Sequence, residues 1–116
     1  MNLFNIPIHA KSPRIINAVI EIEKGSSVKY EYDGDLGVFR YDRSLDSAMT
    51  YPASYGSIPG TICDDGDPLD VLVITERPIA RGVLVETRVL GVLDMDDDGE
   101  KDYKLIGVPV STRRRY

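Results

Sequence analysis

The chain has 116 residues, enough for one domain with a small core, and its hydrophobic content of 42% excludes a disordered polymer. Its net charge of −5 argues against nucleic acid as a partner, because phosphate contact requires a basic surface. No apolar run approaches the roughly 20 residues of a membrane span, and the single cysteine fits a reducing cytoplasm. We therefore expect one cytoplasmic domain over residues 1–116, without a membrane partner.

Strand-like alternation dominates the first part of the chain, and helical periodicity is scarce. Residues 18–22 predict a strand that ends at the turn 24–27. Residues 28–32 alternate in polarity, and a strand there places Lys29 and Glu31 on one face.

A hairpin follows this alternating segment. Asp33-Gly34-Asp35 is typical of a tight turn between antiparallel strands. Residues 38–43 predict the returning strand, with Phe39, Tyr41 and Arg43 on a shared face.

The second half of the chain contains further short strands separated by turns. Residues 51–60 hold two prolines and two glycines, which predicts a structured loop rather than a ladder strand. Residues 69–75 predict a buried strand, residues 83–93 a long strand that Gly91 allows to bend, and residues 104–110 a closing strand. This pattern favours a small closed or half-closed barrel.

Two acidic clusters dominate the charge distribution. Residues 64–70 carry a net charge of −4 and residues 94–102 a net charge of −5, so the remainder of the chain is mildly basic. Carboxylates without histidine or cysteine partners favour hard cations such as magnesium, manganese or calcium. A solvated acidic loop is the simpler alternative, but Asp67 precedes a proline and Asp70 opens an apolar strand, which places both at a strand mouth.

The second cluster begins like a calcium-binding EF-hand loop, with Asp94-x-Asp96-x-Asp98-Gly99. The twelfth position is Leu105, where an EF-hand requires a bidentate glutamate, and strands rather than helices flank the loop. The EF-hand is therefore excluded. The segment instead predicts a hairpin tip that carries Asp97 and Asp102 at its rim.

Two facing carboxylate loops can hold two divalent ions about 3.5–4 Å apart, an arrangement suited to phosphoryl transfer. A phosphate-bearing substrate also requires protein cations and hydroxyl donors. The candidates near strand ends are Lys29, Arg43, Lys104, Tyr51 and Tyr55. Each of them alone fits a solvated or packed side chain, so the hypothesis depends on their joint occurrence with the acids.

The motif D-G-D-P-L-D-V at 65–71 resembles the signature of the soluble, magnesium-dependent inorganic pyrophosphatases. The stretches VIEIEKGSSVKYEYD, YDRSLDSAMTYPASYGSIPGT and RVLGVLDMDDDGEKDYKLIGVPV follow in the order and approximate spacing of that family, so the resemblance covers residues 17–110. It implies an OB-like five-stranded closed barrel with added hairpins. It also implies Mg²⁺-dependent hydrolysis of pyrophosphate to two phosphates by in-line attack of a metal-bound hydroxide, with Mn²⁺ as a substitute ion.

The resemblance implies a role for each matching residue. Asp65, Asp70 and Asp102 would bind the principal metals, Asp97 would complete a further metal position, and Asp67 would be the catalytic base. The phosphates would be held by Lys29, Arg43, Tyr55 and Lys104, and the surrounding layer would be formed by Glu21, Glu31 and Tyr51. Bacterial-type relatives assemble as hexamers, so the resemblance also implies a homo-oligomer.

Two features depart from the family pattern. Ser54 replaces the more usual asparagine, for which we expect a small effect. The family continues past Tyr116 through a C-terminal helix that carries a substrate-binding Tyr-Lys pair, so we expect a barrel that lacks this helix. The alternative hypothesis is consequently a barrel that binds divalent metal or pyrophosphate with weak or no turnover. A third hypothesis, an OB-type nucleic-acid binder, is disfavoured by the negative charge.

Overall fold

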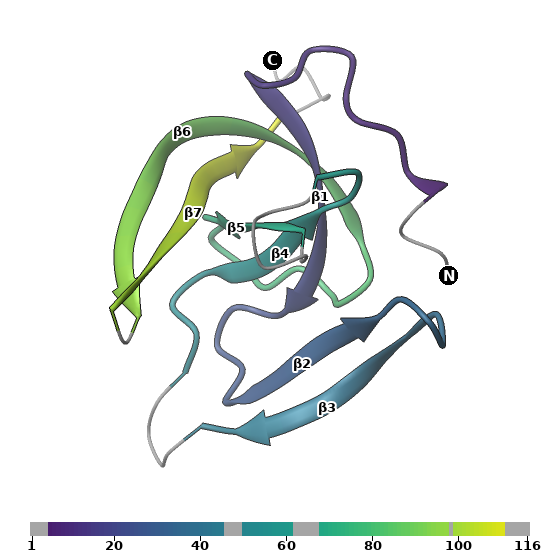
Figure 1. Cartoon of the computed structure of the whole chain (residues 1–116), viewed down its shortest axis with the longest axis vertical. Helices are drawn as coiled ribbons and strands as arrows, with labels where there is room; N and C mark the ends of the chain where they lie inside the picture. The colour runs from purple at the N-terminus through teal and green to yellow at the C-terminus, as the bar shows by residue number, and fades with distance from the viewer. Residues whose placement is uncertain (1–4, 46–49, 62–67, 98, 111–116) are drawn as a thin grey trace.

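The computed structural model describes residues 5–45, 50–61, 68–97 and 99–110 of the chain. The strands in this described part are β1 (Ile15–Ile22), β2 (Val28–Asp33), β3 (Val38–Ser44), β4 (Ser54–Ile58), β5 (Leu69–Val73), β6 (Leu84–Asp97) and β7 (Glu100–Pro109). A closed barrel is formed by five of them in the order β1-β4-β5-β7-β6, and β2 and β3 form a separate ribbon below one end of the barrel (Figure 1). The predicted mainly β fold with a five-stranded closed barrel is confirmed.

The first strand supplies much of the core because it pairs with β4 on one side and with β6 on the other. Ala18, Ile20 and Ile22 are completely buried, and Val19 is 1% exposed. Burying one such aliphatic side chain stabilises the fold by roughly 1.5–3 kcal/mol. The predicted strand 18–22 is thus confirmed, and β1 begins three residues earlier, at Ile15.

The strand β4 contradicts the prediction of a loop over residues 51–60. It lies inside the barrel, antiparallel to both β1 and β5. The prolines at 52 and 59 flank the strand rather than interrupt it, so they remove no hydrogen bond from its ladder. Gly56 has a packing role instead, since a Cβ atom there would lie 2.4 Å from the carbonyl oxygen of Val19.

The β2–β3 ribbon corrects a second expectation. Its register opposes Tyr32 to Phe39 and Tyr30 to Tyr41, but then opposes Lys29 to Arg43. The extra residue, Asp42, forms a bulge that shifts the alternation by one position. Arg43 therefore lies opposite Lys29 instead of sharing a face with Phe39 and Tyr41.

The second acidic cluster lies on the β6–β7 hairpin, as predicted, and β6 continues to Asp97. The register shifts between Val89 and Gly91, which is where the sequence predicted a bend. β7 also pairs with β5, and this pair alone is parallel among the described strand pairs. The parallel pairing opposes Asp70 to Lys104 and so brings Asp70, the last residue of the first acidic cluster, beside the strand that carries Asp102. Within the described ranges, the structure contains no helix with the length and hydropathy of a membrane span.

Candidate active site

Lys104 is the centre of the candidate site. Its Nζ atom lies 2.9 Å from Oδ2 of Asp102 and 3.2 Å from Oδ2 of Asp70. Asp102 stands two positions earlier on β7 and so shares the face of Lys104, whereas Asp70 is its neighbour on β5. Burial lowers the pKa of Lys104, but the hydrogen bonds and charges of Asp102 and Asp70 outweigh this effect and raise it overall. The lysine therefore stays charged at neutral pH.

Tyr55 of β4 lies beside the ion cluster that Lys104 forms with Asp70 and Asp102. The ammonium of Lys104 lies 3.4 Å from the Tyr55 hydroxyl and 5.2 Å from the centre of its ring. Burial is the main cause that raises the pKa of Tyr55 far above its ordinary value, and the hydrogen bond and charge of Asp70 add to it. The phenol consequently stays protonated and can donate a hydrogen bond to an oxyanion.

Glu21 connects the barrel to the ribbon. It stands near the end of β1, is 8% exposed, and its Oε1 atom accepts a hydrogen bond of 3.2 Å from the backbone N–H of Tyr32. Burial raises its pKa from 4.5 to about 7, with smaller upward contributions from the charges of Asp70 and Glu31. The charge of Lys29 acts on the same carboxyl in the opposite direction, so Glu21 interacts with one predicted cation and two predicted acids.

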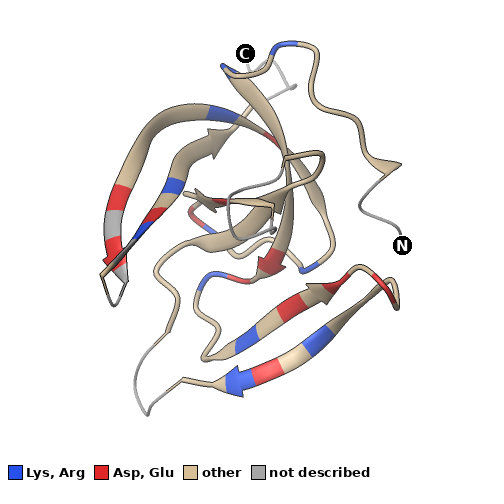
Figure 2. Cartoon of the chain, viewed as in Figure 1, with Lys and Arg blue, Asp and Glu red and all other residues tan. Residues whose placement is uncertain are grey.

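The ribbon carries the remaining predicted cations. Figure 2 shows basic and acidic positions next to one another along β2 and β3, and acidic positions along the β6–β7 hairpin. Lys29 forms an ion pair of 3.4 Å with Asp42, whereas Arg43 has no ion-pair partner within the described residues. Glu31, the predicted outer acid, is exposed on β2.

Several predicted site residues are described only in part or lie outside the described residues. Asp65 and Asp67 lie outside the described residues, and for Asp97 only the backbone, opposite Glu100, is described. Tyr51 is described: its ring centre lies 5.9 Å from that of Tyr55, so the two tyrosine rings pack against each other. The structure thus brings Asp70, Asp102, Lys104 and Tyr55 together and places Glu21 and Tyr51 around them.

The oxygen ligands present fit a hard divalent cation. Two carboxylates from neighbouring strands already converge on one positive group, the ammonium of Lys104. Oxygen ligands of this kind suit Mg²⁺ or Mn²⁺. No group of three or more acidic, histidine or cysteine side chains that could hold a metal is found among the described residues. A third ligand, as the sequence predicts for Asp65, would complete the set.

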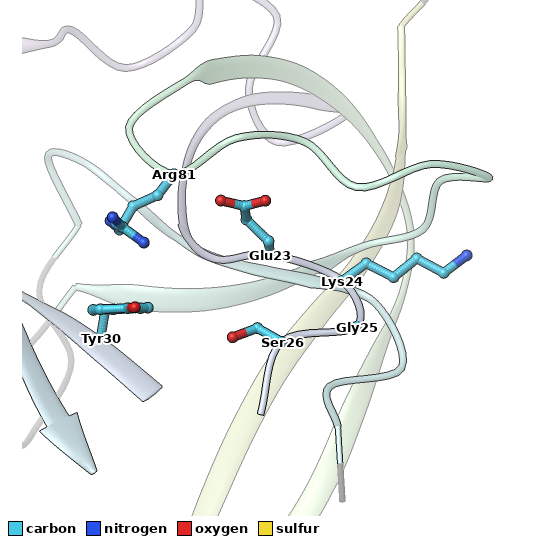
Figure 3. Close-up of a pocket in the computed structure, with 6 residues that line it drawn as sticks. All are labelled: Glu23, Lys24, Gly25, Ser26, Tyr30 and Arg81. Carbon is cyan, nitrogen blue, oxygen red and sulfur yellow. The ribbon is translucent and has the colours of Figure 1, made fainter. Parts of the chain in front are cut away.

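A separate pocket lies between the β1–β2 turn and the segment that precedes β6 (Figure 3). The described residues that line it are Glu23, Lys24, Gly25, Ser26, Tyr30 and Arg81. The guanidinium of Arg81 stacks 4.0 Å above the ring of Tyr30, and the Lys24 ammonium donates to the carbonyl oxygens of Thr75 and Glu76. The predicted catalytic, metal and substrate residues are not among these lining residues, so this pocket and the ion cluster are different places.

Two contacts were not predicted from the sequence. Asp42 became the partner of Lys29 because a bulge changed the register, and no residue pattern marks a bulge at that position. His9 accepts a hydrogen bond from the backbone of Lys11 at Nδ1 and donates one of 2.9 Å from Nε2 to Glu86 on β6. The histidine therefore anchors the N-terminal segment to the barrel rather than binding a metal.

Comparison with known proteins gives a consistent result. A family model described as inorganic pyrophosphatase matches residues 18–116. The inorganic pyrophosphatase of Thermus thermophilus is 48% identical over 113 residues, which cover 97% of this chain and 65% of that relative. The corresponding protein of Geobacillus stearothermophilus is 54% identical over 101 residues, which cover 87% of this chain and 61% of that relative.

Solved structures show the same likeness. The crystal structure of inorganic pyrophosphatase from Thermus thermophilus matches with a TM-score of 0.89 and 49% identity, over 94% of this chain and 63% of that one. An inorganic pyrophosphatase from Neisseria gonorrhoeae also matches with a TM-score of 0.89, at 42% identity, over 97% of this chain and 65% of that one.

The fold and the ion cluster define a barrel protein with carboxylates, a lysine and a tyrosine on three neighbouring strands. Together with these matches, they show that the chain belongs to the inorganic pyrophosphatase family. The chain spans 65% of the Thermus relative and 61% of the Geobacillus relative.

Proposed function

We propose that the chain hydrolyses inorganic pyrophosphate to two phosphates with the help of a divalent cation, Mg²⁺ in the first place and Mn²⁺ as a substitute. The observation that carries this proposal is the convergence of Asp70, Asp102, Lys104 and Tyr55 in a chain of this family. Carboxylates supply ligands for a cation, and the lysine and the tyrosine supply donors for phosphate oxygens.

The acidic residues divide into metal ligands and a base. Asp65, Asp70 and Asp102 would hold the principal ions, and Asp97 would contribute to a further one. Bound divalent ions neutralise phosphate charge and lower the pKa of a coordinated water. Asp67 accepts the proton of the water that attacks phosphorus, and the bond to the leaving phosphate breaks in line with that attack.

The cationic and hydroxyl groups hold the substrate from two sides. Lys104 and Tyr55 lie on the barrel, and Lys29 and Arg43 lie opposite each other on the ribbon. Arg43 offers a planar pair of donors for two phosphate oxygens, whereas each lysine offers a compact charge. The Tyr55 hydroxyl stays protonated for the pKa reason given above and donates to an oxygen of the leaving phosphate.

The test is phosphate release from pyrophosphate with Mg²⁺, compared between the wild-type chain and Asp67→Asn. We expect a loss of about 10²–10⁴-fold in rate, the usual contribution of a general base. Asp64→Asn is the matched control, since it removes the same charge three positions away and retains the rate. Chelation of divalent ions abolishes release. Equal rates for wild type and Asp67→Asn contradict the assigned base.

The alternative function, binding without turnover, predicts a different result in the same experiment. Calorimetry would then show that the wild-type chain binds Mg²⁺ or pyrophosphate, while no phosphate is released at any Mg²⁺ concentration.

We further propose that residues 1–116 fold as one cytoplasmic domain that assembles as a homo-oligomer, a hexamer as the family resemblance implies. The single cysteine fits a reducing compartment. Exposed apolar side chains on β6, among them Leu90 and Val92, offer a surface for self-association. Sedimentation of the purified chain measures the oligomeric state directly.

A further inference from the structure

The two carboxylates proposed as metal ligands already share a positive charge that belongs to the chain. Oδ2 of Asp102 lies 2.9 Å from the ammonium of Lys104 and Oδ2 of Asp70 lies 3.2 Å from it. The lysine side chain is only 16% exposed, so water screens this contact weakly. One oxygen of each carboxylate that would bind a divalent ion is therefore paired with an ammonium in the metal-free chain.

The strand geometry explains why these three groups meet. Asp102 and Lys104 are two positions apart on β7 and point to the same face. Asp70 is opposed to Lys104 by the parallel pairing of β5 with β7. Without a positive charge, two partly buried carboxylates this close would repel each other and destabilise that pairing.

We propose that Lys104 is a built-in counter-cation that keeps Asp70 and Asp102 in place before a divalent ion binds and leaves them when the ion arrives. This inference rests on the proposed function, because it takes the two aspartates as metal ligands. An ammonium and a divalent ion on the same two carboxylates repel each other, so each weakens the binding of the other. The affinity of the chain for the ion is therefore set by competition with Lys104.

Tyr55 provides the position to which the released ammonium moves. Its hydroxyl lies 3.4 Å from Nζ of Lys104 and its ring centre 5.2 Å from it, so a small rotation of the lysine keeps both contacts. An aromatic face attracts a cation. Lys104 would then be free of the carboxylates and available for a phosphate oxygen, so metal binding prepares the site for substrate. In this role Lys104 is a positioning residue for the metal ligands.

The first test is calorimetric titration with Mg²⁺ alone, without pyrophosphate, on the wild-type chain, Lys104→Met and Lys101→Met. Lys101 is the matched control, because it lies on the same strand, carries the same charge and is 61% exposed at 3.7 Å from Asp94. We expect Lys104→Met to bind Mg²⁺ about tenfold more tightly than wild type and Lys101→Met to change affinity less than about twofold. A lysine that only binds phosphate would leave Mg²⁺ affinity unchanged.

A second measurement uses the wild-type chain and so does not depend on whether a variant folds. Acetylation of lysines by a water-soluble reagent, read residue by residue in a mass spectrometer, is compared with and without Mg²⁺. We expect Lys104 to be labelled several-fold faster when Mg²⁺ is present, because it has lost its ion pairs, and Lys101 to be labelled at a nearly constant rate.

The outcomes separate this inference from the proposed function. Unchanged or weaker Mg²⁺ binding by Lys104→Met, or unchanged labelling of Lys104, overturns the counter-cation while the metal site and the hydrolysis remain. A wild-type chain that binds neither Mg²⁺ nor Mn²⁺ overturns both proposals. Tighter binding by Lys104→Met together with slower pyrophosphate hydrolysis supports both.

Discussion

Glu21 is a buried acidic side chain whose ionisation is unfavourable in the folded chain. Its carboxyl is almost completely buried beside Asp70 and Glu31, and burial raises its pKa from 4.5 to about 7. Between these two values the folded chain keeps a proton that the unfolded chain has lost. Raising the pH through this window therefore favours the unfolded state, and the loss of stability is complete above about pH 7.

We predict that Glu21→Gln removes this pH dependence in the metal-free chain. The amide oxygen still accepts the hydrogen bond of the Tyr32 backbone, but the side chain has no charge to desolvate. Urea unfolding in the presence of a chelator should show that wild type loses up to roughly 3 kcal/mol from acid to neutral pH and that the variant loses far less. Glu31→Gln, at an exposed position, should keep most of the wild-type slope, because burial is the main cause of the raised pKa of Glu21. Parallel curves for wild type and Glu21→Gln would contradict the assignment.

Ser54 gives a second prediction at the scale of one residue. It is completely buried, and its hydroxyl has no hydrogen-bond partner among the described residues. Ser54→Ala should raise the free energy of unfolding by up to about 1 kcal/mol, because an unpaired buried hydroxyl destabilises the fold. Thr87→Val serves as the contrast: its buried hydroxyl donates to the carbonyl of Val85, so that change should lower stability. Denaturant unfolding measures the free energy of unfolding of both variants. Destabilisation by Ser54→Ala would indicate that the hydroxyl has a hydrogen-bond partner.

At the scale of elements, β4 depends on one glycine. A Cβ atom at Gly56 would lie 2.4 Å from the carbonyl oxygen of Val19 and 3.0 Å from its carbonyl carbon. These are backbone atoms of the central strand β1, so they cannot move aside without breaking the ladder.

We predict that Gly56→Ala lowers the free energy of unfolding by about 2–4 kcal/mol or prevents folding. Gly91→Ala is the control, because a Cβ at Gly91 meets no heavy atom of the described residues within 4 Å outside its chain neighbours. Thermal unfolding followed by circular dichroism measures both variants. Similar melting temperatures for Gly56→Ala and Gly91→Ala would show that β1 and β4 can move apart at little cost, which would contradict the prediction.

The elements also show what the sequence can and cannot predict. Alternation and turn residues predicted β1, the hairpin of β2 and β3, β5, and the β6–β7 hairpin, since these signals are local. The strand β4 was missed because its two prolines suggested a loop, although they only flank the strand. The bulge at Asp42 was missed because it depends on how two strands pair, and it moved Arg43 to the position opposite Lys29.

The candidate site, like the fold, could be predicted from the sequence only in part. The residue types and the family resemblance predicted Asp70, Asp102, Lys104 and Tyr55 as one group, and the structure brings them together. That Lys104 bridges the two aspartates could not be predicted, because it follows from the parallel pairing of β5 with β7. The predictions for Asp65 and Asp67 lie outside the described residues and remain predictions.

At the scale of the whole molecule, the outer face of β6 is unusually apolar. Leu90 and Val92 are each 58% exposed in the described structure, two positions apart on a long strand. We predict that the unassembled chain, at high dilution, binds an apolar fluorescent dye and that Leu90→Thr with Val92→Thr reduces this binding at unchanged net charge. Leu36→Thr, at a position in the turn of the ribbon that is 67% exposed, should change it little. Equal fluorescence from wild type and the double variant would exclude β6 as the binding surface.

The position of β7 between β5 and β6 has a consequence for synthesis on the ribosome. Each of the other barrel strands precedes β7 in the chain, yet β5 finds its second neighbour only when β7 pairs with it. Until about residue 110 has left the exit tunnel, the nascent sheet has two open edges, and Asp70 has no lysine beside it. The emergence of a single strand therefore closes the barrel and assembles the ion cluster at the same moment.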